Sequence, residues 1–331
     1  MSSGPKLIDR FQRSLNYLRI SITDHCNLRC LYCAPDNLIP KLRHDEILTY
    51  EEILRIVKVG AGLGISKVRV TGGEPLTRKG VDPFLKQLCT MDGIDECSLT
   101  TNGVLLKSHL TAIQAAGVKR LNISLDTLSE KRYKSITGRD QFNKTWDAII
   151  AAHAMGFDPI KINVVMLEGH NDDEWVDLAK LTYQYPFRVR FIEYMPIGRA
   201  AQKRESTLQI ETIKARLAQT EELIPLTHNP NDGPAERWRF KSAQGEIGFI
   251  GALSNHFCGT CNRLRLTASG QLRACLLADR EIDIKAPLRS GATDAELAQL
   301  FLAAAQIKPE RHHLSDDPKQ SASSEMSSIG G

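Results

Sequence analysis

Three cysteines lie close together near the start of the chain, at Cys26, Cys30 and Cys33, directly after a strand-like run over residues 17–22. Thiolates at this spacing can bind three irons of a [4Fe–4S] cluster, whereas an all-cysteine cluster uses four ligands. No fourth cysteine follows nearby in the sequence, so one iron would stay open for a substrate. Zinc is the alternative, but structural zinc usually has four ligands in paired spacings.

Three further cysteines form a second group towards the other end of the chain: Cys258, Cys261 and Cys275. A C-x-x-C pair alone would be typical of half a zinc ribbon, and His256 is the close candidate for a fourth zinc ligand. Arg263 and Arg265 follow directly and share one face if this run is a strand. Three cysteines beside two such arginines favour a second iron–sulfur cluster with an open iron.

Cationic and apolar side chains alternate along several strand-like runs. In the run 67–71, Lys67, Arg69 and Thr71 share one face, while the valines share the other. The same alternation recurs at Arg19, Ser21, Lys161, Asn163, Arg188 and Arg190. Helices cover the outside of a barrel sheet, so we expect the apolar residues outside and the cations inside. Few carboxylates besides Asp126 and Glu193 lie on these strands, and unpaired buried cations are costly, so we expect a polyanionic ligand such as a triphosphate.

The runs that carry these residues alternate between strands and helices. Strands are predicted at residues 17–22, 67–71, 97–101, 120–126, 160–166 and 189–194. Helices are predicted between them, at 112–116, 148–155, 175–181 and after Leu48, where Thr49 and Glu52 form a capping box. Six such units predict an α/β fold, an incomplete (β/α)6 TIM-type barrel with active groups gathered at the carboxyl ends of its strands.

The pattern changes after Gly198, which predicts a boundary there. We assign residues 1–198 to the partial barrel with the first cluster and 199–314 to a smaller C-terminal α+β region with the second. Short strands are expected at 237–241, 246–250, 263–267 and 271–274, and a helix from Asp294 to about Gln306. Residues 315–331 are rich in serine, which predicts a flexible tail, and they end in Gly330 and Gly331.

The overall composition is that of an ordinary globular protein, with 42% hydrophobic and 25% charged residues among 331. A formal net charge of +4 is too small to indicate a nucleic-acid partner. No apolar run approaches the roughly 20 residues of a membrane span, and no secretory signal is visible, so we expect a cytoplasmic protein. Thiols stay reduced there, which favours metal ligation by the clustered cysteines and ordinary buried thiols at Cys89 and Cys97.

The C-x3-C-x2-C spacing, with Tyr32 before the last cysteine, resembles the signature of the radical S-adenosylmethionine superfamily. That resemblance implies that the open iron binds the amino and carboxylate groups of S-adenosylmethionine, whose reductive cleavage yields a 5′-deoxyadenosyl radical. The turn Gly72-Gly73-Glu74-Pro75 is similar to the superfamily segment that binds the methionyl amino group. By the same resemblance, the contacts to S-adenosylmethionine come from Tyr32, Gly73, Ser124 and Met195.

The two cysteine groups, the Gly-Gly turn, the run 190–195 and the double-glycine end together resemble the GTP 3′,8-cyclase family, also called the molybdenum cofactor biosynthesis protein A family. The resemblance implies an incomplete (β/α)6 barrel closed by the C-terminal region. It also implies two [4Fe–4S] clusters that face each other across one cavity, with guanine bound to the open iron of the second. Positions that match GTP contacts are Arg19, Lys67, Arg69, Thr100, Lys161, Arg190, Arg263, Leu264 and Arg265. Positions that match catalytic residues are Arg19, Arg263, Arg265, Gly330 and Gly331, the last two as a tail that reaches into the cavity.

This family converts GTP to 3′,8-cyclo-7,8-dihydro-GTP, the first step of molybdenum cofactor biosynthesis, after the radical removes the ribose 3′-hydrogen. The implied partners are GTP, a one-electron donor of the flavodoxin or ferredoxin type, and a downstream cyclic pyranopterin monophosphate synthase. No nucleic acid and no membrane are expected, and the chain would be a monomer or a homodimer. Two alternatives remain open: a radical enzyme with an auxiliary cluster that acts on a peptide or another nucleotide, and a zinc-stabilised binding module without catalysis.

Overall fold

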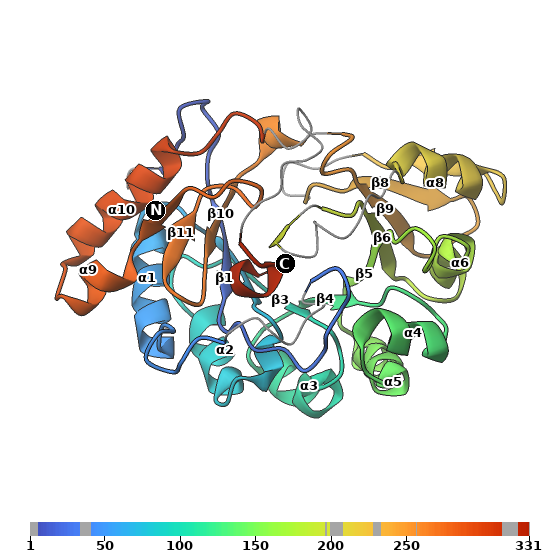
Figure 1. Ribbon diagram of the computed structural model, residues 1–331, viewed down its shortest axis with the longest axis horizontal. Coiled ribbons are helices and arrows are strands. Elements are labelled where there is room, and N and C mark those ends of the chain that lie inside the picture. Colours follow the sequence, from blue (N-terminus) through green and yellow to red (C-terminus); the bar gives the residue numbers. More distant parts are fainter. Residues whose placement is uncertain are drawn as a thin grey trace.

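The computed structural model describes residues 6–33, 41–195, 197–198, 208–227, 233–255, 257–312 and 324–330. Its strands are β1 (Tyr17–Ser21), β2 (Lys67–Thr71), β3 (Glu96–Thr101), β4 (Arg120–Ser124), β5 (Ile160–Val165), β6 (Arg188–Ile192), β7 (Leu223–Pro225), β8 (Glu236–Phe240), β9 (Glu246–Ile250), β10 (Arg263–Leu266), β11 (Gln271–Arg273) and β12 (Glu281–Asp283). They form one sheet in the order β12-β11-β10-β1-β2-β3-β4-β5-β6-β9-β8-β7 (Figure 1).

The central part of this sheet is parallel. Strands β1 to β6 pair in chain order, β10 adds in parallel beyond β1, and β9 adds in parallel beyond β6. Antiparallel strands complete both sides, β11 and β12 next to β10, and β8 and β7 next to β9. This confirms the predicted α/β fold with an incomplete TIM-type barrel.

The strands of the C-terminal region continue the barrel sheet at both sides instead of forming a layer of their own. Within the described residues β12 and β7 are the two edges of this sheet, so it is open. The reason is that β9 and β10 pair in parallel with β6 and β1, the outer strands of the six-stranded barrel. The domain boundary at residue 198 stays a prediction.

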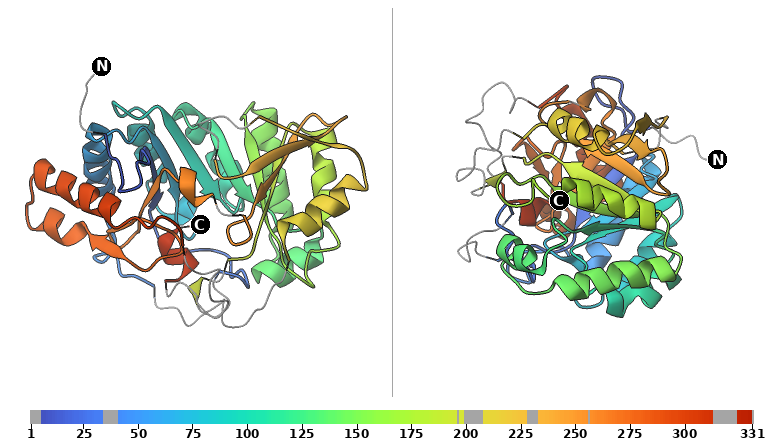
Figure 2. Two further views of the ribbon diagram at one scale, coloured as in Figure 1. Left: turned by 90° about the horizontal axis from the view of Figure 1, so that it is seen from above. Right: turned by 90° about the vertical axis from the view of Figure 1, so that its right-hand side faces the viewer.

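The helices are α1 (Tyr50–Gly62), α2 (Val81–Cys89), α3 (Leu106–Ala115), α4 (Glu130–Thr137), α5 (Phe142–Ala154), α6 (Trp175–Gln184), α8 (Ile210–Ala218), α9 (Lys285–Arg289), α10 (Asp294–Gln306) and α11 (Met326–Ile329), with 3-10 turns η1 (Pro75–Thr77) and η2 (Cys258–Thr260). Helices α1 to α6 lie outside the curved sheet (Figure 1). Figure 2 shows α9 and α10 at one end of the molecule and α8 at the other, where α10 packs on α1 and α8 on α6. No helix within the described residues has the length and apolarity needed to cross a membrane.

The capping box predicted at the start of α1 is confirmed. The Thr49 hydroxyl accepts from the Glu52 backbone N–H at 3.2 Å, and the Glu52 carboxylate accepts from the Thr49 N–H at 2.7 Å. The predicted helices 112–116 and 148–155 cover only the second halves of α3 and α5. Helix α3 begins earlier because Leu106 and Leu110, one turn apart, are already buried against the sheet.

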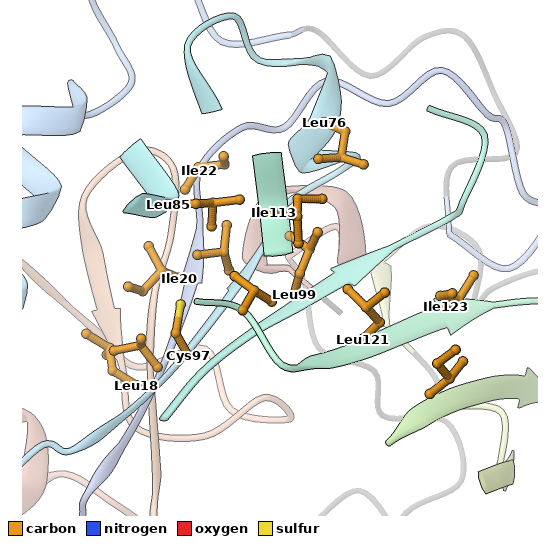
Figure 3. Packing of buried hydrophobic residues seen from close by; sticks show 14 of the residues in the cluster. Leu18, Ile20, Ile22, Leu76, Leu85, Cys97, Leu99, Ile113, Leu121 and Ile123 are labelled. Atoms are coloured by element: carbon orange, nitrogen blue, oxygen red, sulfur yellow. The ribbon is translucent and has the colours of Figure 1, made fainter. Parts of the chain in front are cut away.

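The hydrophobic core lies between the outer helices and the outer face of the sheet. Figure 3 shows part of it, with the labelled residues Leu18, Ile20, Ile22, Leu76, Leu85, Cys97, Leu99, Ile113, Leu121 and Ile123. Leu18 and Ile20 of β1 are fully buried there. Because side chains alternate along a strand, the intervening Arg19 lies on the opposite face of the sheet, as predicted.

Residues 324–330, near the serine-rich end of the chain, are part of the described structure. Residues 326–329 form the short helix α11, and Ile329 is only 1% exposed. Ile329 packs with Ile197 and Leu277 in a small apolar cluster separate from the main core. This contact is long-range, so the local composition from residue 315 onwards gave no sign of it. In Figure 1, α11 lies inside the curve of the sheet.

Candidate active site

The first cysteine group lies on the loop that follows β1, at the carboxyl edge of the parallel sheet. The backbone N–H groups of Arg29 and Leu31 donate to the carbonyl oxygens of Thr137 and Ile136, at 2.8 and 2.9 Å. These two bonds attach the loop between Cys26 and Cys33 to the last turn of α4. The cysteine loop is therefore supported by a helix of the barrel, although α4 follows it by about a hundred residues.

The three thiols of this loop interact with one another. Burial raises the pKa of Cys30 well above its ordinary value, and the neighbouring Cys33, Asp126 and Cys26 raise it further. Burial, reinforced by Cys26, raises the pKa of Cys33 to about 12. Thiolates collected in this way require a compensating cation, which iron would supply.

Two neutral donors reach the sulfur of Cys26. The Leu28 backbone N–H lies 3.4 Å and the Asn102 side-chain amide 3.7 Å from that sulfur. Such N–H donors are typical partners of the sulfurs in iron–sulfur sites. Within the described residues, no three His, Cys, Asp or Glu side chains are arranged to hold a single metal ion. The fit to an iron–sulfur cluster therefore rests on the donor set, three clustered thiols with N–H donors to one of them.

The Gly72-Gly73 turn after β2 packs directly on the backbone that precedes Cys26. The N–H groups of Gly73 and Glu74 donate to the carbonyl oxygens of Thr23 and His25, both at 2.7 Å. A Cβ at Gly73 would collide with the His25 carbonyl oxygen. Besides the predicted contact of this turn with the methionyl amino group, the structure gives Gly73 a further role, which is contact with the cysteine loop.

Glu74 joins this turn to the end of β3, a role that the sequence analysis did not assign. It is fully buried and accepts hydrogen bonds from the Thr101 hydroxyl at 2.8 Å and the Asn102 backbone N–H at 2.7 Å. Burial raises the pKa of Glu74 to about 7 despite these donors. Its position directly after two glycines was the signal in the sequence that could have identified it.

Tyr32 connects the cysteine loop to the end of β4. Its hydroxyl donates to the carboxylate of Asp126 at 2.8 Å, and the Val165 N–H donates to the other oxygen of that carboxylate at 2.8 Å. Burial raises the pKa of Asp126 to about 6. Ser124 is the last residue of β4 and half-buried, so Tyr32, Ser124 and Gly73 all lie at the carboxyl edge of the sheet.

Met195 follows β6 at the same edge. It is half-buried and packs against the apolar cluster of Ile197, Leu277 and Ile329, which Cys275 also contacts. The cluster brings residues predicted for S-adenosylmethionine binding and for the second cysteine group into contact with α11. The roles of Tyr32, Gly73, Ser124 and Met195 as ligands of S-adenosylmethionine remain predictions.

The second cysteine group lies at the amino end of β10. Cys258 begins the η2 turn and Cys261 follows it, just before this strand. Cys275 comes two residues after Arg273, which pairs with Arg265 of β10. Burial raises the pKa of Cys258, and so do the neighbouring Cys275 and Cys261. Burial also acts to raise the pKa of Cys261, but Arg263 and Lys308 outweigh it and lower that pKa to about 6. This group too is a set of clustered thiols with nearby N–H donors, as an iron–sulfur cluster requires.

The segment after α10 closes over the second cysteine group and was not predicted. Lys308 donates to the sulfur of Cys261 at 3.4 Å, and the backbone N–H of His312 donates to Cys258. Arg13, from the N-terminal end of the chain, donates to the carbonyl oxygen of Cys258 at 2.6 Å. No local pattern in the sequence marks these residues, because their partners lie far away along the chain.

Cys89 and Cys97 are remote from both groups, as expected. Cys97 is buried in the main core, and Cys89 packs against that core from the end of α2. The Cys89 thiol, together with burial, raises the pKa of Cys97 well above its ordinary value. Both thiols therefore pack with the main hydrophobic core.

The inward cations form a row across neighbouring strands. Arg265, Arg19 and Arg69 are direct cross-strand partners on β10, β1 and β2. Burial lowers the pKa of Arg19 to about 10, and burial together with Arg19 and Arg263 lowers the pKa of Arg265 well below its usual value. Within the described residues none of the three forms an ion pair with a carboxylate, so their binding of an anion stays a prediction that this arrangement favours.

The cations on β5 and β6 differ in the partners of their side chains. Burial, with Arg190 as its first electrostatic neighbour, lowers the pKa of Lys161 to about 6. Arg190 donates to the side-chain oxygens of Asn122 and Asn163, at 2.7 and 2.5 Å. Lys161, Arg188 and Arg190 line one pocket together with residues of β8 and β9.

Ion pairs with carboxylates neutralise some of the cations predicted for the inner face. Lys67 pairs with Glu96 at 2.9 Å, and Arg188 pairs with Glu246 at 3.4 Å. Glu96 and Glu246 begin β3 and β9 beside these cations, so the pairing follows from strand register. Lys67 and Arg188 are therefore weaker candidates for an anion than Arg19, Arg69, Lys161 and Arg190.

The remaining predicted residues fall into different surroundings. Thr100 is half-buried on β3 opposite Asn122, on the inner face. Leu264 is 1% exposed in the main core, so its side chain faces away from Arg263 and Arg265. Only its backbone atoms are available to a ligand on the inner face.

Gly330 lies among the site residues at the end of the chain. Its carbonyl oxygen accepts a hydrogen bond from Arg265. A Cβ at this position would lie 2.7 Å from Thr71 and 3.1 Å from Ser21, at the ends of β2 and β1, and its φ of +74° also favours glycine. The tail thus reaches the carboxyl edge of the sheet beside the Gly72 turn. Gly331 and His256 lie outside the described residues.

Comparison with known proteins gives two family matches. Residues 20–182 match the Radical SAM superfamily, and residues 187–314 match Molybdenum Cofactor Synthesis C. The GTP 3′,8-cyclase of Moorella thermoacetica is 49% identical over 98% of this chain and 99% of that protein. The enzyme of the same name from Heliobacterium modesticaldum is 47% identical over 98% of this chain and 100% of that protein.

A solved structure with a similar fold is SuiB of Streptococcus suis. It has a TM-score of 0.62 with this chain and 16% sequence identity, and the match covers 93% of this chain and 69% of SuiB. At this level of identity the likeness concerns the fold, which is the partial barrel described above.

Proposed function

Because the chain belongs to the GTP 3′,8-cyclase family, we propose that it is a radical S-adenosylmethionine enzyme that converts GTP to (8S)-3′,8-cyclo-7,8-dihydroguanosine 5′-triphosphate. This reaction is the first step of molybdenum cofactor biosynthesis. Relatives that carry this name are between 41% and 49% identical over 98% of the chain. The similarity therefore extends over both regions of the chain and is not limited to one domain.

The single observation that carries the proposal is the cationic row between the two cysteine groups. Arg19 and Arg265 are partners on the parallel strands β1 and β10. Cys26 follows the carboxyl end of β1, whereas Cys261 precedes the amino end of β10. An anion held by these arginines therefore lies between the two groups, which suits a substrate that must reach both.

Membership of the family implies an iron–sulfur cluster and S-adenosylmethionine. We assign the first [4Fe–4S] cluster to Cys26, Cys30 and Cys33, and the contacts to S-adenosylmethionine to Tyr32, Gly73, Ser124 and Met195. When bound, this pair of groups supplies the radical that removes the ribose 3′-hydrogen. The chain itself orients the cysteine loop, through the Tyr32–Asp126 hydrogen bond and through the contacts of Gly73 and Glu74.

We assign the second [4Fe–4S] cluster to Cys258, Cys261 and Cys275, with guanine on its open iron. The triphosphate is then bound by the cations for which the described residues provide no carboxylate partner: Arg19, Arg69, Lys161 and Arg190. Lys67 shares its charge with Glu96 and has a smaller part. Arg263 and Arg265, with the backbone of Leu264 and the hydroxyl of Thr100, complete the proposed contacts to GTP.

The last two residues form part of the proposed catalytic site. The carbonyl group of Gly330 accepts from Arg265, so the tail helps to hold this guanidinium beside Arg19. Gly331 extends the same segment by one residue without a side chain. We propose that Arg19, Arg263 and Arg265, aligned in this way, orient the ribose and guanine for cyclisation.

Partners and location follow from the proposed reaction. A one-electron donor of the flavodoxin or ferredoxin type reduces the first cluster. A cyclic pyranopterin monophosphate synthase then uses the product as its substrate. We propose a cytoplasmic enzyme without nucleic-acid or membrane partners, because six ligand thiols must stay reduced. A monomer and a homodimer are both compatible with this scheme, and sedimentation would distinguish them.

The direct test is anaerobic turnover. Reduced, iron-loaded protein with S-adenosylmethionine and GTP should yield 5′-deoxyadenosine and the cyclised nucleotide in equal amounts, measured by chromatography and mass spectrometry. Two [4Fe–4S] clusters correspond to about eight irons per chain. Bound zinc without iron would contradict the enzyme assignment, and equal turnover of ATP would contradict the guanine-binding role of the second cluster.

A further inference from the structure

Lys308 makes an unusual set of contacts beside the second cysteine group. It follows α10 and is only 2% exposed. Its side-chain nitrogen donates to three acceptors, the sulfur of Cys261 at 3.4 Å, the carbonyl oxygen of Arg263 at 2.8 Å and that of Ala274 at 2.7 Å. A neutral amine has only two N–H bonds, so this geometry needs the ammonium form with its three donors.

The three acceptors belong to the two chain segments that carry the cysteines. Arg263 begins β10, two residues after Cys261, and Ala274 follows β11, directly before Cys275. The Lys308 nitrogen therefore connects the two chain segments that together carry the proposed ligands of the second cluster. The ammonium also brings a full positive charge to a buried cysteine sulfur, where the effective dielectric constant is low.

The backbone around Lys308 is held in place by other contacts. Arg13 donates to the carbonyl oxygens of Pro309 at 2.6 Å and Glu310 at 2.9 Å. Asp9 fixes Arg13 through an ion pair of 2.6 Å. These contacts anchor the backbone next to Lys308 without using its side chain, so replacing the head group of Lys308 leaves the segment anchored.

We propose that the Lys308 ammonium is a positioning residue of the second iron–sulfur cluster that raises the reduction potential of this cluster through its hydrogen bond to Cys261. The inference rests on the proposed assignment of that cluster to Cys258, Cys261 and Cys275. Reduction adds negative charge to a cluster and its sulfurs, so a nearby cation and an N–H···S bond stabilise the reduced form more than the oxidised form. The described hydrogen bonds to Cys26 of the first group come from neutral donors instead.

The experiment isolates the second cluster in the full chain. Cys26→Ala, Cys30→Ala and Cys33→Ala together remove the first site, and the remaining cluster is titrated with a reductant while its reduced form is followed by electron paramagnetic resonance. Lys308→Met and Lys308→Gln remove the charge, whereas Lys308→Arg keeps it. Lys285→Met is the matched control. Lys285 begins α9 and also donates to a backbone carbonyl oxygen, that of Glu46 at 2.7 Å, and this contact involves no cysteine.

We expect Lys308→Met and Lys308→Gln to lower the fraction of reduced cluster at a fixed potential. A tenfold change in the ratio of reduced to oxidised cluster corresponds to about 59 mV for one electron. Lys308→Arg should stay close to the unsubstituted chain, and Lys285→Met should match it. Loss of the second cluster from the Met and Gln variants alone, with full iron in the Arg variant, would equally support the role of the charge.

Three results would overturn the inference. If Lys308→Met and Lys308→Gln keep the cluster at an unchanged potential, the ammonium does not tune it. If all three Lys308 variants lose the cluster, the site needs the shape of lysine and not its charge. If the chain without the first three cysteines binds no iron, the second cluster itself is absent, and the proposed assignment fails together with this inference.

Discussion

Lys161 illustrates how burial and neighbouring cations on the inner face of the sheet change the protonation of a side chain. Burial and the nearby Arg190, Arg69, Arg188 and Arg120 lower its pKa to about 6, so it is mostly neutral above that pH in the free protein. A bound triphosphate would offer the opposite environment and favour the ammonium form. Binding of the proposed substrate is therefore coupled to uptake of a proton.

We expect GTP binding at pH 8 to take up about one proton per chain and to weaken as the pH rises from 6 to 9. The sign follows because the free protein holds fewer protons at Lys161 than the complex in this range. Calorimetry in buffers with different ionisation enthalpies measures the uptake. Lys161→Met should remove it and weaken binding, while Lys58→Met, an exposed control on α1, should leave both unchanged. Affinity that increases with pH would contradict the assignment.

At the scale of helices, strands and loops, single glycines allow neighbouring segments to pack against each other. Gly73 allows the turn after β2 to pair with the loop that carries Cys26, and Gly330 allows the tail to pack between the ends of β1 and β2. Neither contact involves a side chain of the glycine itself. Substitution at these positions therefore tests the packing of elements and not the chemistry of a residue.

Gly73→Ala should displace the first cysteine loop. The added Cβ would collide with the His25 carbonyl oxygen, so we expect loss of about four of the eight irons, with the second cluster retained. Iron and sulfide analysis with electron paramagnetic resonance measures this. Gly62→Ala is the control, because a Cβ there meets nothing within 4 Å, and the exchange should be neutral or slightly stabilising. Full iron content in Gly73→Ala would show that the loop adapts.

Deletion of Gly330 and Gly331 should leave both clusters assembled and reduce turnover by roughly 100-fold, the size of effect that misplacement of catalytic groups produces. The physical reason is loss of the Gly330 carbonyl that holds Arg265. Product formation under single-turnover conditions measures the effect. Ser328→Ala, which removes a hydroxyl that donates to the carbonyl oxygen of Glu325, the residue before α11, at 2.7 Å, should retain activity. Full turnover by the shortened chain would remove the tail from the catalytic site.

Over the whole molecule, residues 9–13 and the segment after α10 meet beside the second cysteine group. Arg13 joins the N-terminal segment to residues 309 and 310, and α10 packs on α1. The parallel strands β2 to β5, by contrast, have no cysteine ligands and enclose the main core. Metal loading should therefore stabilise particular parts of the molecule more than others.

Removal of iron with a chelator should lower Tm by several degrees, because ligands that bind only the folded state stabilise it. Hydrogen exchange should increase most over residues 26–33 and 257–275, and least over β2 to β5. Mass spectrometry of exchanged peptides measures both regions in one experiment. A uniform increase over the whole chain would mean that the clusters hold the global fold and not these two loops.

The residues alone predicted a large part of this protein. Alternation of side chains along strands placed Arg19, Arg69 and Lys161 on the inner face, since this periodicity is a property of the extended backbone. The spacing of Cys26, Cys30 and Cys33 is likewise local, and so is the capping box of Thr49. The inner-face placement of these cations and the capping box needed no knowledge of distant contacts, which is why both predictions were confirmed.

Other features depend on residues that are far apart in the chain. The pairing of Lys67 with Glu96 follows from the register of β2 and β3, and the contact of Lys308 with Cys261 requires α10 to end beside β10. The order of the tail around Ile329 depends on an apolar cluster built from three separate segments. Local sequence determined which side chains face inward and which thiols are grouped, because both are set by short-range geometry. The tertiary structure decided which cations keep their charge for an anion and which donors reach the sulfurs, because burial and pairing exist only after the chain has folded.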